Sequence, residues 1–531
     1  MFALIEIAFP GLVTVFTKIS ICLVFSWLIV GGAVAAETSP AASNSASEAR
    51  INQILAKLTL EEKVSLLSGI SGFDTASIER LGIRGMTFSD GAHGVRANDG
   101  TVATVYPVGI ALASTWNVAM AQSMGKAIGE EAREHDVQVM LGPNINLVRS
   151  PLAGRNFETF GEDPVLTSRI GVGYVQGMQS TGVSATPKHF IGNEQETERF
   201  RGSSNIDERT LNELYLVPFE SVVREAHPWA LMTAYNRLNG TFMTEHGELL
   251  KQLLKKEWGF DGVVMSDWGA AHSLNVISSG LDLEMPGPAQ VLGQSLINAV
   301  YYRQVSEAAV NDAARRMLRL YARTGHLDAE QKTNKHMSEL HVQEHHKLAC
   351  DIATEALVLL KNDHDALPLD ANKIKRVAVI GPNADAAIVQ GSGSSQVLAS
   401  EFVTPLQAIR AQVPSTVKID FEAGVDNEWS PRVLDARYFS PTRDHKQIGL
   451  LANYYANANG AGKPVLSQVE TNIGGMSFGG VITARGGRSM SAQWTGFFFA
   501  PHDGEYELSL EHLDVNAGSN LAGEGVKLGV H

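Results

Sequence analysis

Short apolar runs alternate with helical patterns from about residue 50 to residue 325, and each run ends in polar or charged residues. Clear examples are MTFSDGAHGV, VSATPKHF, WALMTAYNRLNG and GVVMSDWG. Alternation of this kind predicts parallel strands joined by helical crossovers. Polar residues at the carboxyl ends of such strands are typical of a (β/α) barrel, which carries its functional groups at that edge. We therefore predict a (β/α) barrel over residues 49–325.

The rest of the chain divides by composition. Residues 326–344 are polar and predict a linker. Residues 345–445 contain a helical pattern and the run RVAVIGPN, which indicates a buried strand and the first part of a second α/β domain. Residues 446–531 hold aromatic runs separated by Gly, Asn and Pro, a pattern typical of an all-β sandwich. The predicted fold class is α/β.

The N-terminus carries an export pattern. An apolar run over residues 19–36 follows Lys18 and ends near the small residues Ala33 to Ala35, which suits cleavage of a signal peptide over residues 1–36. An uncleaved anchor is the alternative. Residues 37–48 are small and polar and predict a linker. We expect a periplasmic or secreted protein with no membrane association after cleavage.

The charge balance limits the partners. The formal net charge is −14, whereas binding to nucleic acid relies on an excess of Lys and Arg. With 44% hydrophobic and 19% charged residues the composition is that of a globular protein. We expect no nucleic acid partner.

Asp267 is the strongest candidate for chemistry. It follows the apolar strand pattern of GVVMS, where an unpaired carboxylate is costly to bury. The alternative is an aspartate that caps a following helix. Trp268 beside it is suited to the apolar face of a sugar ring, although an aromatic residue also serves for packing.

Other predicted strand ends carry side chains that can donate hydrogen bonds. Lys188 and His189 end the VSATPKHF run, and Arg199 follows in the next loop. A histidine on a strand is more often a core residue than a ligand-binding one. Arg155 could equally form a structural ion pair with Glu158 or Glu162. Asp90 ends the first of these strands.

Two other motifs carry less weight. His341, Glu344 and His345 match the H-x-x-E-H zinc-protease pattern, but a third ligand is not evident, so we interpret the segment as a solvated helix. The run QGSGSS lacks the Lys of a phosphate-binding loop.

Five motifs in order, SDGAHGVR, GRNFETFGEDP, TPKHF, MTAYN and VVMSDWGA, resemble those of glycoside hydrolase family 3, and the resemblance covers residues 50–440. In that family the Asp of the SDW motif is the nucleophile, which matches Asp267. The residues that match the family's sugar-binding set are Asp90, Arg155, Lys188, His189, Arg199, Met232, Tyr235 and Trp268.

The resemblance also informs the subtype. The N-acetylglucosaminidase branch has an Asp-His pair after its KHF motif, and this chain has IGNEQETERF instead. Residues 446–531 look like the protective-antigen-type sandwich that is inserted in some β-glucosidases of the family. In those relatives the acid/base Glu follows the insert, so we expect it beyond His531 and the chain to be a C-terminally truncated fragment. Glu194, Glu196 and Glu198 are the alternatives near the barrel rim.

The resemblance implies a retaining, exo-acting hydrolase of terminal β-linked glucosyl residues in oligosaccharides or in aryl and alkyl glucosides. Retaining chemistry uses two protein carboxyl groups, so we expect neither a metal nor an organic cofactor. A β-xylosidase is the nearest alternative. A non-catalytic sugar-binding protein is a second one, from a different class. A homo-oligomer is compatible with the sequence.

Overall fold

The computed structural model describes residues 40–96, 102–327, 339–386, 388–391, 393–399, 402–425, 436–455, 457, 460–471 and 491–500. The chain divides into two compact units, Met1–Ala46 and Ser47–His531. The predicted signal peptide, residues 1–36, lies outside the described residues. Within the described part of the chain, no helix combines the length and the apolar character needed to cross a membrane.

Parallel strands form the centre of the second unit. They are β1 (Phe88–Asp90), β2 (Val139–Leu141), β3 (Ser184–Ala185), β5 (Ala230–Met232) and β8 (Val263–Met265). β1, β2 and β3 pair in parallel in that order, and β5 pairs in parallel with β8. All five are fully buried, because helices cover the outside and side chains fill the inside.

Single backbone pairs connect these strands into a ring. Phe190 pairs with Thr233 and so links the end of β3 to the end of β5. Beyond β8 the pairs run from Met265 to Leu283 and from Glu284 to Ser68. The segment that begins at Ser68 then returns to the start of β1, through Asp74 paired with Thr87. This closed path is the geometry of an α/β barrel, so the predicted α/β fold class is confirmed.

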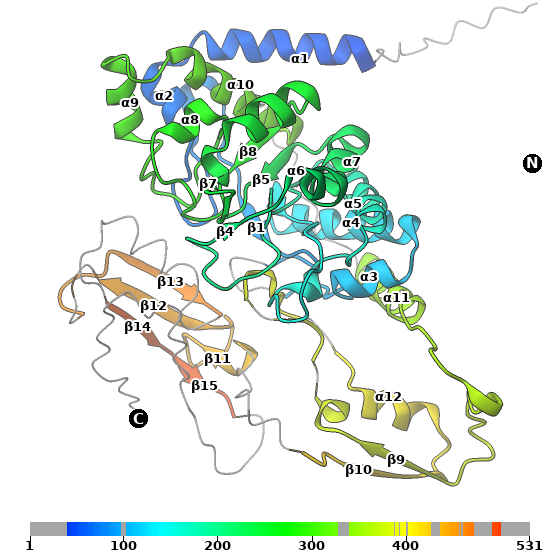
Figure 1. Cartoon of the computed structure of the whole chain (residues 1–531). Coiled ribbons are helices and arrows are strands. Elements are labelled where there is room, and N and C mark those ends of the chain that lie inside the picture. The colour runs from blue at the N-terminus through cyan, green and yellow to red at the C-terminus, as the bar shows by residue number, and fades with distance from the viewer. Residues whose placement is uncertain are drawn as a thin grey trace, which may run out of the picture. The chain divides into compact units, whose positions relative to one another are not determined.

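Long amphipathic helices surround the barrel: α4 (Val118–Glu134), α5 (Pro164–Gln179), α7 (Leu216–Ala226) and α10 (Glu307–Arg323). In Figure 1, α4, α5 and α7 lie side by side in cyan and teal. Side chains cap the starts of three of them, namely Asn117 for α4, Asp163 for α5 and Ser306 for α10. A Cβ atom at Gly177 would lie 1.9 Å from the Gln122 carbonyl oxygen, so glycine permits the close approach of α5 to α4.

Shorter elements complete the barrel region. They are α2 (Leu60–Ser65), α3 (Gly109–Ser114), α6 (Glu208–Thr210), α8 (Asn275–Ser279), α9 (Gln294–Tyr301), β4 (Ser203–Ser204), β6 (Arg237–Leu238) and β7 (Thr241–Phe242). The segments η3 (Leu211–Tyr215) and η5 (Glu248–Glu257) are wound as π-helices.

The later part of the chain has two kinds of sheet. After α11 (Glu339–Glu355), β9 (Arg376–Ile380) and β10 (Lys418–Glu422) pair in parallel, and α12 (Pro405–Gln412) connects them. The remaining strands are antiparallel: β11 (Phe439–Ser440) with β15 (Phe497–Phe498), and β12 (Leu450–Tyr455) between β13 (Leu466–Glu470) and β14 (Ser491–Thr495). Except for β11, these short antiparallel strands fall inside the predicted sandwich region, residues 446–531. Residues 456, 458–459, 472–490 and 501–531 of that region are outside the described residues.

The structure corrects three local predictions. Helix α1 (Pro40–Leu55) begins inside the segment predicted as a linker, residues 37–48, because alanines give that segment helix propensity. Helix α11 likewise begins at Glu339, inside the predicted linker 326–344. The strand β9 is not buried throughout, since Ile380 is 76% exposed in a sheet of only two strands.

Candidate active site

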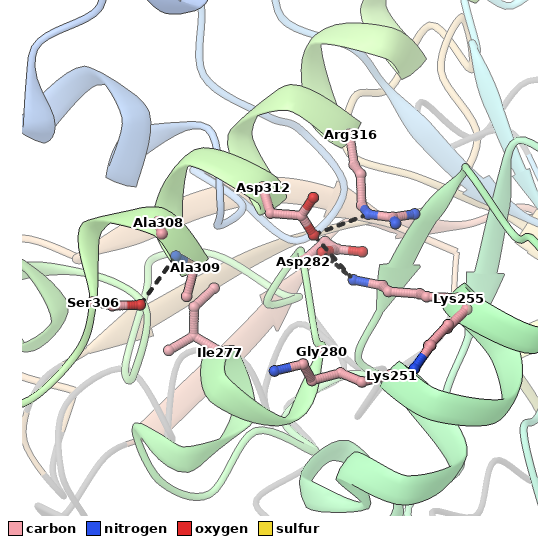
Figure 2. Close-up of a pocket in the computed structure, with 11 residues that line it drawn as sticks. Lys251, Lys255, Ile277, Gly280, Asp282, Ser306, Ala308, Ala309, Asp312 and Arg316 are labelled. Carbon is pink, nitrogen blue, oxygen red and sulfur yellow. Dashed lines mark hydrogen bonds and ion pairs between the residues drawn. The ribbon is translucent and has the colours of Figure 1, made fainter.

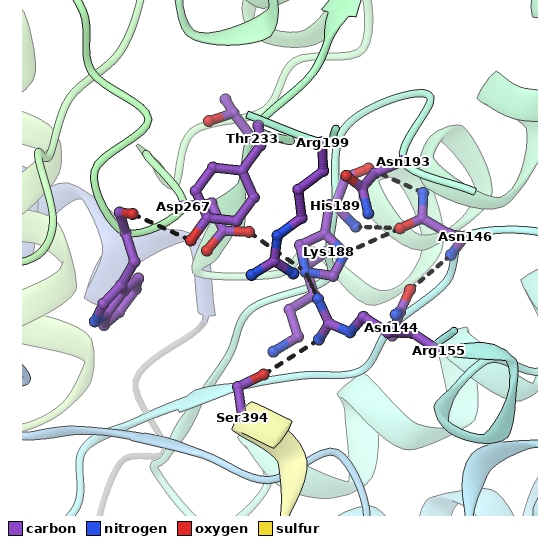
Figure 3. A network of polar contacts seen from close by, with 12 residues as sticks. Asn144, Asn146, Arg155, Lys188, His189, Asn193, Arg199, Thr233, Asp267 and Ser394 are labelled. Carbon is purple, nitrogen blue, oxygen red and sulfur yellow. Dashed lines mark hydrogen bonds and ion pairs between the residues drawn. The ribbon is translucent and has the colours of Figure 1, made fainter. Parts of the chain in front are cut away.

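One pocket gathers every site residue that the sequence predicts. Its walls are formed by Asp90, Arg155, Lys188, His189, Arg199, Met232, Tyr235, Asp267 and Trp268, together with Leu141 and Ser394. Asp90, Leu141 and Met232 end strands β1, β2 and β5, and the other barrel residues follow β2, β3, β5 and β8. The pocket therefore lies at the carboxyl ends of the barrel strands, where neighbouring strands bring distant parts of the sequence together (Figure 3).

Asp267 lies two residues beyond the end of β8 and is 8% exposed. The backbone turns directly after it, with the Ala270 amide donating to the Asp267 carbonyl at 3.0 Å. Helix α8 begins only at Asn275, so the alternative in which Asp267 caps a helix is wrong. Its Oδ2 atom is buried and has no hydrogen-bond donor. A buried carboxylate oxygen without a donor is energetically unfavourable and is therefore a sign of function.

Burial raises the pKa of Asp267 to about 6, and the positive charges of Arg199, Arg155 and Lys188 oppose that rise. These cations keep the carboxyl group from being neutral at physiological pH. Asp267 is thus an ionised carboxylate at about pH 7, held in a largely dehydrated place.

The position of His189 explains the free Asp267 oxygen. The Asn146 side-chain oxygen lies 2.9 Å from the His189 amide and 3.0 Å from Nδ1, so Nδ1 carries the proton. Nε2 then accepts from Arg155 Nη1 at 3.0 Å. Burial, followed by the charges of Arg155 and Lys188, lowers the pKa of His189 well below its usual value. The ring is neutral, and Nε2 has no proton to donate to Asp267 Oδ2, which is 3.5 Å away.

Two buried ion pairs include residues that line the pocket. Lys188 Nζ lies 3.1 Å from Asp90 Oδ1, and both side chains are almost fully buried. Arg155 pairs with Glu158, as one alternative proposed, and not with Glu162. The same guanidinium also reaches His189 and Ser394, so Arg155 has a structural partner and lines the pocket as well.

Aromatic residues form another part of the wall. Tyr235 donates its hydroxyl to the Trp268 carbonyl at 3.1 Å. The Trp268 ring packs 5.4 Å from Phe73, and its Nε1 donates to the Gly72 carbonyl at 3.1 Å. The Arg199 guanidinium lies 4.8 Å from the centre of the Tyr235 ring.

The rim glutamates have other contacts. Glu196 pairs with Arg199, and the exposed Glu198 pairs with Arg201. Glu194 accepts from Asn146 Nδ2 at 3.1 Å, and burial raises its pKa to about 8. Among the residues that line the pocket, only Asp90 and Asp267 are carboxylates, and Asp90 is paired with Lys188.

Two lining residues were not predicted. Leu141 carries no chemical signal in the sequence. Ser394 belongs to the QGSGSS segment, which we considered only as a phosphate loop. Its hydroxyl accepts from Arg155 at 3.4 Å, so this segment lines the pocket instead.

A larger cleft of about 460 Å³ lies elsewhere on the barrel, between η5 and the start of α10 (Figure 2). Its central charges are neutralised internally, because Lys255 pairs with Asp282 and Arg316 pairs with Asp312. Arg316 also donates to the Gly262 carbonyl just before β8 begins, so this cleft lies at the amino-terminal end of that strand. It contains none of the predicted site residues.

The H-x-x-E-H segment does not form a metal site in the described part of the chain, where no group of three or more His, Cys, Asp or Glu side chains is placed to hold a metal ion. His345 is not solvated as expected. Its Nδ1 lies 2.8 Å from Glu131 on α4, and the side chain is buried.

Comparison with known proteins identifies the family. Residues 32–320 match the glycosyl hydrolase family 3 N terminal domain, and residues 357–495 match the glycosyl hydrolase family 3 C-terminal domain. The chain belongs to glycosyl hydrolase family 3. The resemblance inferred from the five motifs is thereby confirmed.

Two similar relatives are named as beta-glucosidases. A beta-glucosidase of Rhizobium radiobacter is 44% identical over 390 residues, which are 72% of this chain and 47% of the relative. Thermostable beta-glucosidase B of Acetivibrio thermocellus is 38% identical over 385 residues, 70% of this chain and 50% of the relative.

Two solved structures of beta-glucosidases are also similar to this chain. Beta-glucosidase 3B from Thermotoga neapolitana in complex with glucose has a TM-score of 0.64 at 34% identity, covering 70% of this chain and 55% of that one. The Kluyveromyces marxianus beta-glucosidase in complex with glucose has a TM-score of 0.69 at 33% identity, covering 79% and 52%. The chain thus spans about half the length of the relatives it matches.

Proposed function

We propose that the whole protein is a retaining, exo-acting β-glucosidase in which Asp267 is the nucleophile. The observation that carries the proposal is the Asp267 Oδ2 atom, which is buried, unpaired and surrounded by three cationic side chains within the predicted pocket. The beta-glucosidase relatives at 38–44% identity support glucosides as the substrate class.

In the first step Oδ2 of Asp267 attacks the anomeric carbon of the glucosyl residue. A bond forms between them while the bond to the leaving oxygen breaks, and that oxygen leaves with the bonding electrons. In the second step a water oxygen bonds to the same carbon while the bond to Asp267 breaks. Asp267 leaves as a carboxylate, and the water proton passes to the solvent. Two displacements at one carbon restore the original configuration.

The other side chains have roles in binding. We assign Lys188, His189, Arg155 and Asp90 to the hydroxyl groups of the sugar, because they present donors and acceptors at one end of a small pocket. Arg155 and Arg199 also keep Asp267 ionised through their positive charge. Removal of a terminal sugar is proposed from the family resemblance.

The other described carboxylates near Asp267 are engaged in contacts of their own. Asp90 is paired with Lys188, and the rim glutamates bind Asn146 and nearby arginines. The acid/base Glu expected after residue 531 stays a prediction of the family resemblance. Export to the periplasm or the medium stays a prediction from the N-terminal apolar run.

A substrate whose leaving group departs without protonation tests the proposal on this chain. Dinitrophenolate departs unaided, so a dinitrophenyl β-D-glucoside should be hydrolysed. Nuclear magnetic resonance should show β-glucose as the first product. The appearance of α-glucose first would indicate inversion and would overturn the proposed mechanism.

A further inference from the structure

Asn146 is a buried amide side chain that contacts His189 at three points. Its Oδ1 atom lies 2.9 Å from the His189 backbone nitrogen and 3.0 Å from ring Nδ1, and its Nδ2 donates to the His189 carbonyl at 3.0 Å (Figure 3). Asn146 is 2% exposed and does not itself line the pocket. It can therefore influence the pocket only through the residues that it holds, of which His189 is one.

The partners of Asn146 determine how its amide is oriented. The His189 backbone N–H can only donate, so the amide oxygen must face it. Nδ2 also donates to Glu194 Oε1 at 3.1 Å. The Asn146 backbone N–H donates to Asn144 Oδ1 at 3.0 Å, which holds the loop in place. An acceptor oxygen fixed beside Nδ1 requires that this ring nitrogen carry the proton.

The charges around the His189 ring allow it a single proton. Burial, followed by the positive charges of Arg155, Lys188 and Arg199, lowers its pKa well below the usual value. The opposing charge is that of Asp267, whose Oδ2 lies 3.5 Å from Nε2. The one ring proton must lie on Nδ1, facing the amide oxygen, or on Nε2, facing Asp267. In the second arrangement Nε2 would donate to the oxygen that attacks the sugar.

We propose that Asn146 is a positioning residue for glucosyl transfer: it holds the ring proton of His189 on Nδ1 and so keeps Oδ2 of Asp267 free to attack. The proposal rests on the proposed β-glucosidase function, in which Asp267 is the nucleophile. It adds a residue that does not line the pocket and acts through His189.

Nuclear magnetic resonance measures the tautomer directly. With isotope-labelled histidine, the nitrogen chemical shifts show which ring nitrogen is protonated, and the His189 signals are those missing from His189→Gln. We expect the proton on Nδ1 in the wild type and on Nε2 in Asn146→Ala, where Asp267 is the acceptor within reach. The wild-type spectrum needs no Asn146 variant. A proton on wild-type Nε2 would therefore overturn the proposal even if Asn146→Ala did not fold.

The rate of glucosyl transfer gives a second readout. A hydrogen bond from Nε2 to Asp267 must be broken during attack. Asn146→Ala should therefore slow the single-turnover release of dinitrophenolate from a dinitrophenyl β-glucoside by about ten- to hundredfold. The same bond favours the ionised form and lowers the pKa of Asp267, so the loss of rate in acid should move to a lower pH than in the wild type.

Asn236→Ala is the matched control. Asn236 is another buried asparagine, and its Nδ2 donates to the Ile191 carbonyl at 3.2 Å, close to His189 in the sequence. Its truncation also removes a buried amide, but it should leave the His189 proton on Nδ1 and the acid side of the rate profile unchanged. Thermal unfolding of each variant shows whether it is folded.

The outcomes separate this role from the proposed function. Retention of the Nδ1 proton in folded Asn146→Ala, or the same proton shift in Asn236→Ala, would contradict the role of Asn146. A folded wild type that has the Nδ1 proton but releases no dinitrophenolate would refute the proposed β-glucosidase function. The role in glucosyl transfer would then fall with it, whereas the tautomer would stand as measured.

Discussion

At the scale of single residues, Asp267 combines two requirements that oppose each other. It must be ionised to attack, yet burial raises its pKa to about 6. In the unfolded chain an aspartate has a pKa near 3.8. The folded state therefore loses stability as the pH rises from the unfolded value through the folded one, because ionisation is less favourable in the folded state.

Asp267→Asn keeps the shape of the side chain and removes the charge. At about pH 7 we expect the variant to be more stable than the wild type by about 1–3 kcal/mol in the free energy of unfolding. The gain should vanish at about pH 4, where folded Asp267 is protonated. Urea denaturation at both pH values measures the difference. Glu257→Gln, at an exposed carboxylate, is the control. A variant that is less stable at both pH values would contradict the account.

The same pKa predicts how activity depends on pH. Only the ionised carboxylate can attack, so the rate of glucosyl transfer to Asp267 should fall as the pH decreases below about 6. The release of dinitrophenolate in a single turnover measures this step, and a rate that is unchanged down to about pH 4 would show that the nucleophile is not buried as described.

The residues of the candidate site differ in how well the sequence predicts their position in the pocket. Asp267, Lys188 and Asp90 could be predicted because parallel strands bring their carboxyl ends together. Ser394 could not, since it comes from outside the barrel and its neighbours in sequence do not indicate that it approaches Arg155. The tautomer of His189 also depends on a distant residue, Asn146, that has no motif of its own.

At the scale of elements, α11 contacts the barrel through a buried polar cluster. His345 Nδ1 lies 2.8 Å from Glu131 Oε1, and Nε2 lies 3.3 Å from Glu130. Glu131 also accepts from the Thr104 amide at 3.0 Å and from the Tyr106 hydroxyl at 3.3 Å. Burial lowers the pKa of His345, but the two glutamates outweigh it and the pKa is raised overall.

This cluster predicts a pH dependence of stability. A histidine whose pKa is raised by folding stabilises the protein below its unfolded pKa, and the effect disappears as the pH rises through the folded pKa. The difference in unfolding free energy between the wild type and His345→Gln should therefore be larger at about pH 6 than at about pH 9. Urea denaturation measures it, with the exposed His364→Gln as control. A difference that is the same at both pH values would show that His345 contributes only packing.

Elements were predicted less accurately at their ends than at their centres. The alternation of apolar runs identified the barrel strands, because burial on both faces leaves a continuous apolar signal. The first turns of α1 and α11 have polar sequences, and we predicted them as linkers. Exposed helical turns need no apolar residues, so the apolar pattern does not indicate where these helices begin. The exposure of Ile380 on β9 depends on how many strands join the sheet, which local sequence does not encode.

At the scale of the whole molecule, the chain combines a family 3 barrel with a second region that matches the family's C-terminal domain. The barrel places Asp267, the proposed nucleophile, and the proposed sugar-binding residues at the carboxyl ends of one closed ring of strands. Composition does not show that the relatives are about twice as long as this chain. The five ordered motifs, in contrast, predict the family.

The central claim is that Asp267 forms a covalent bond with the sugar. A deoxyfluoro glucoside with a dinitrophenolate leaving group reacts with the nucleophile of a retaining enzyme but is released slowly. After incubation with this trap, digestion and mass spectrometry should locate the added deoxyfluoroglucosyl mass on Asp267, and Asp267→Ala should acquire none. A label on any other carboxylate of the folded chain would contradict the account.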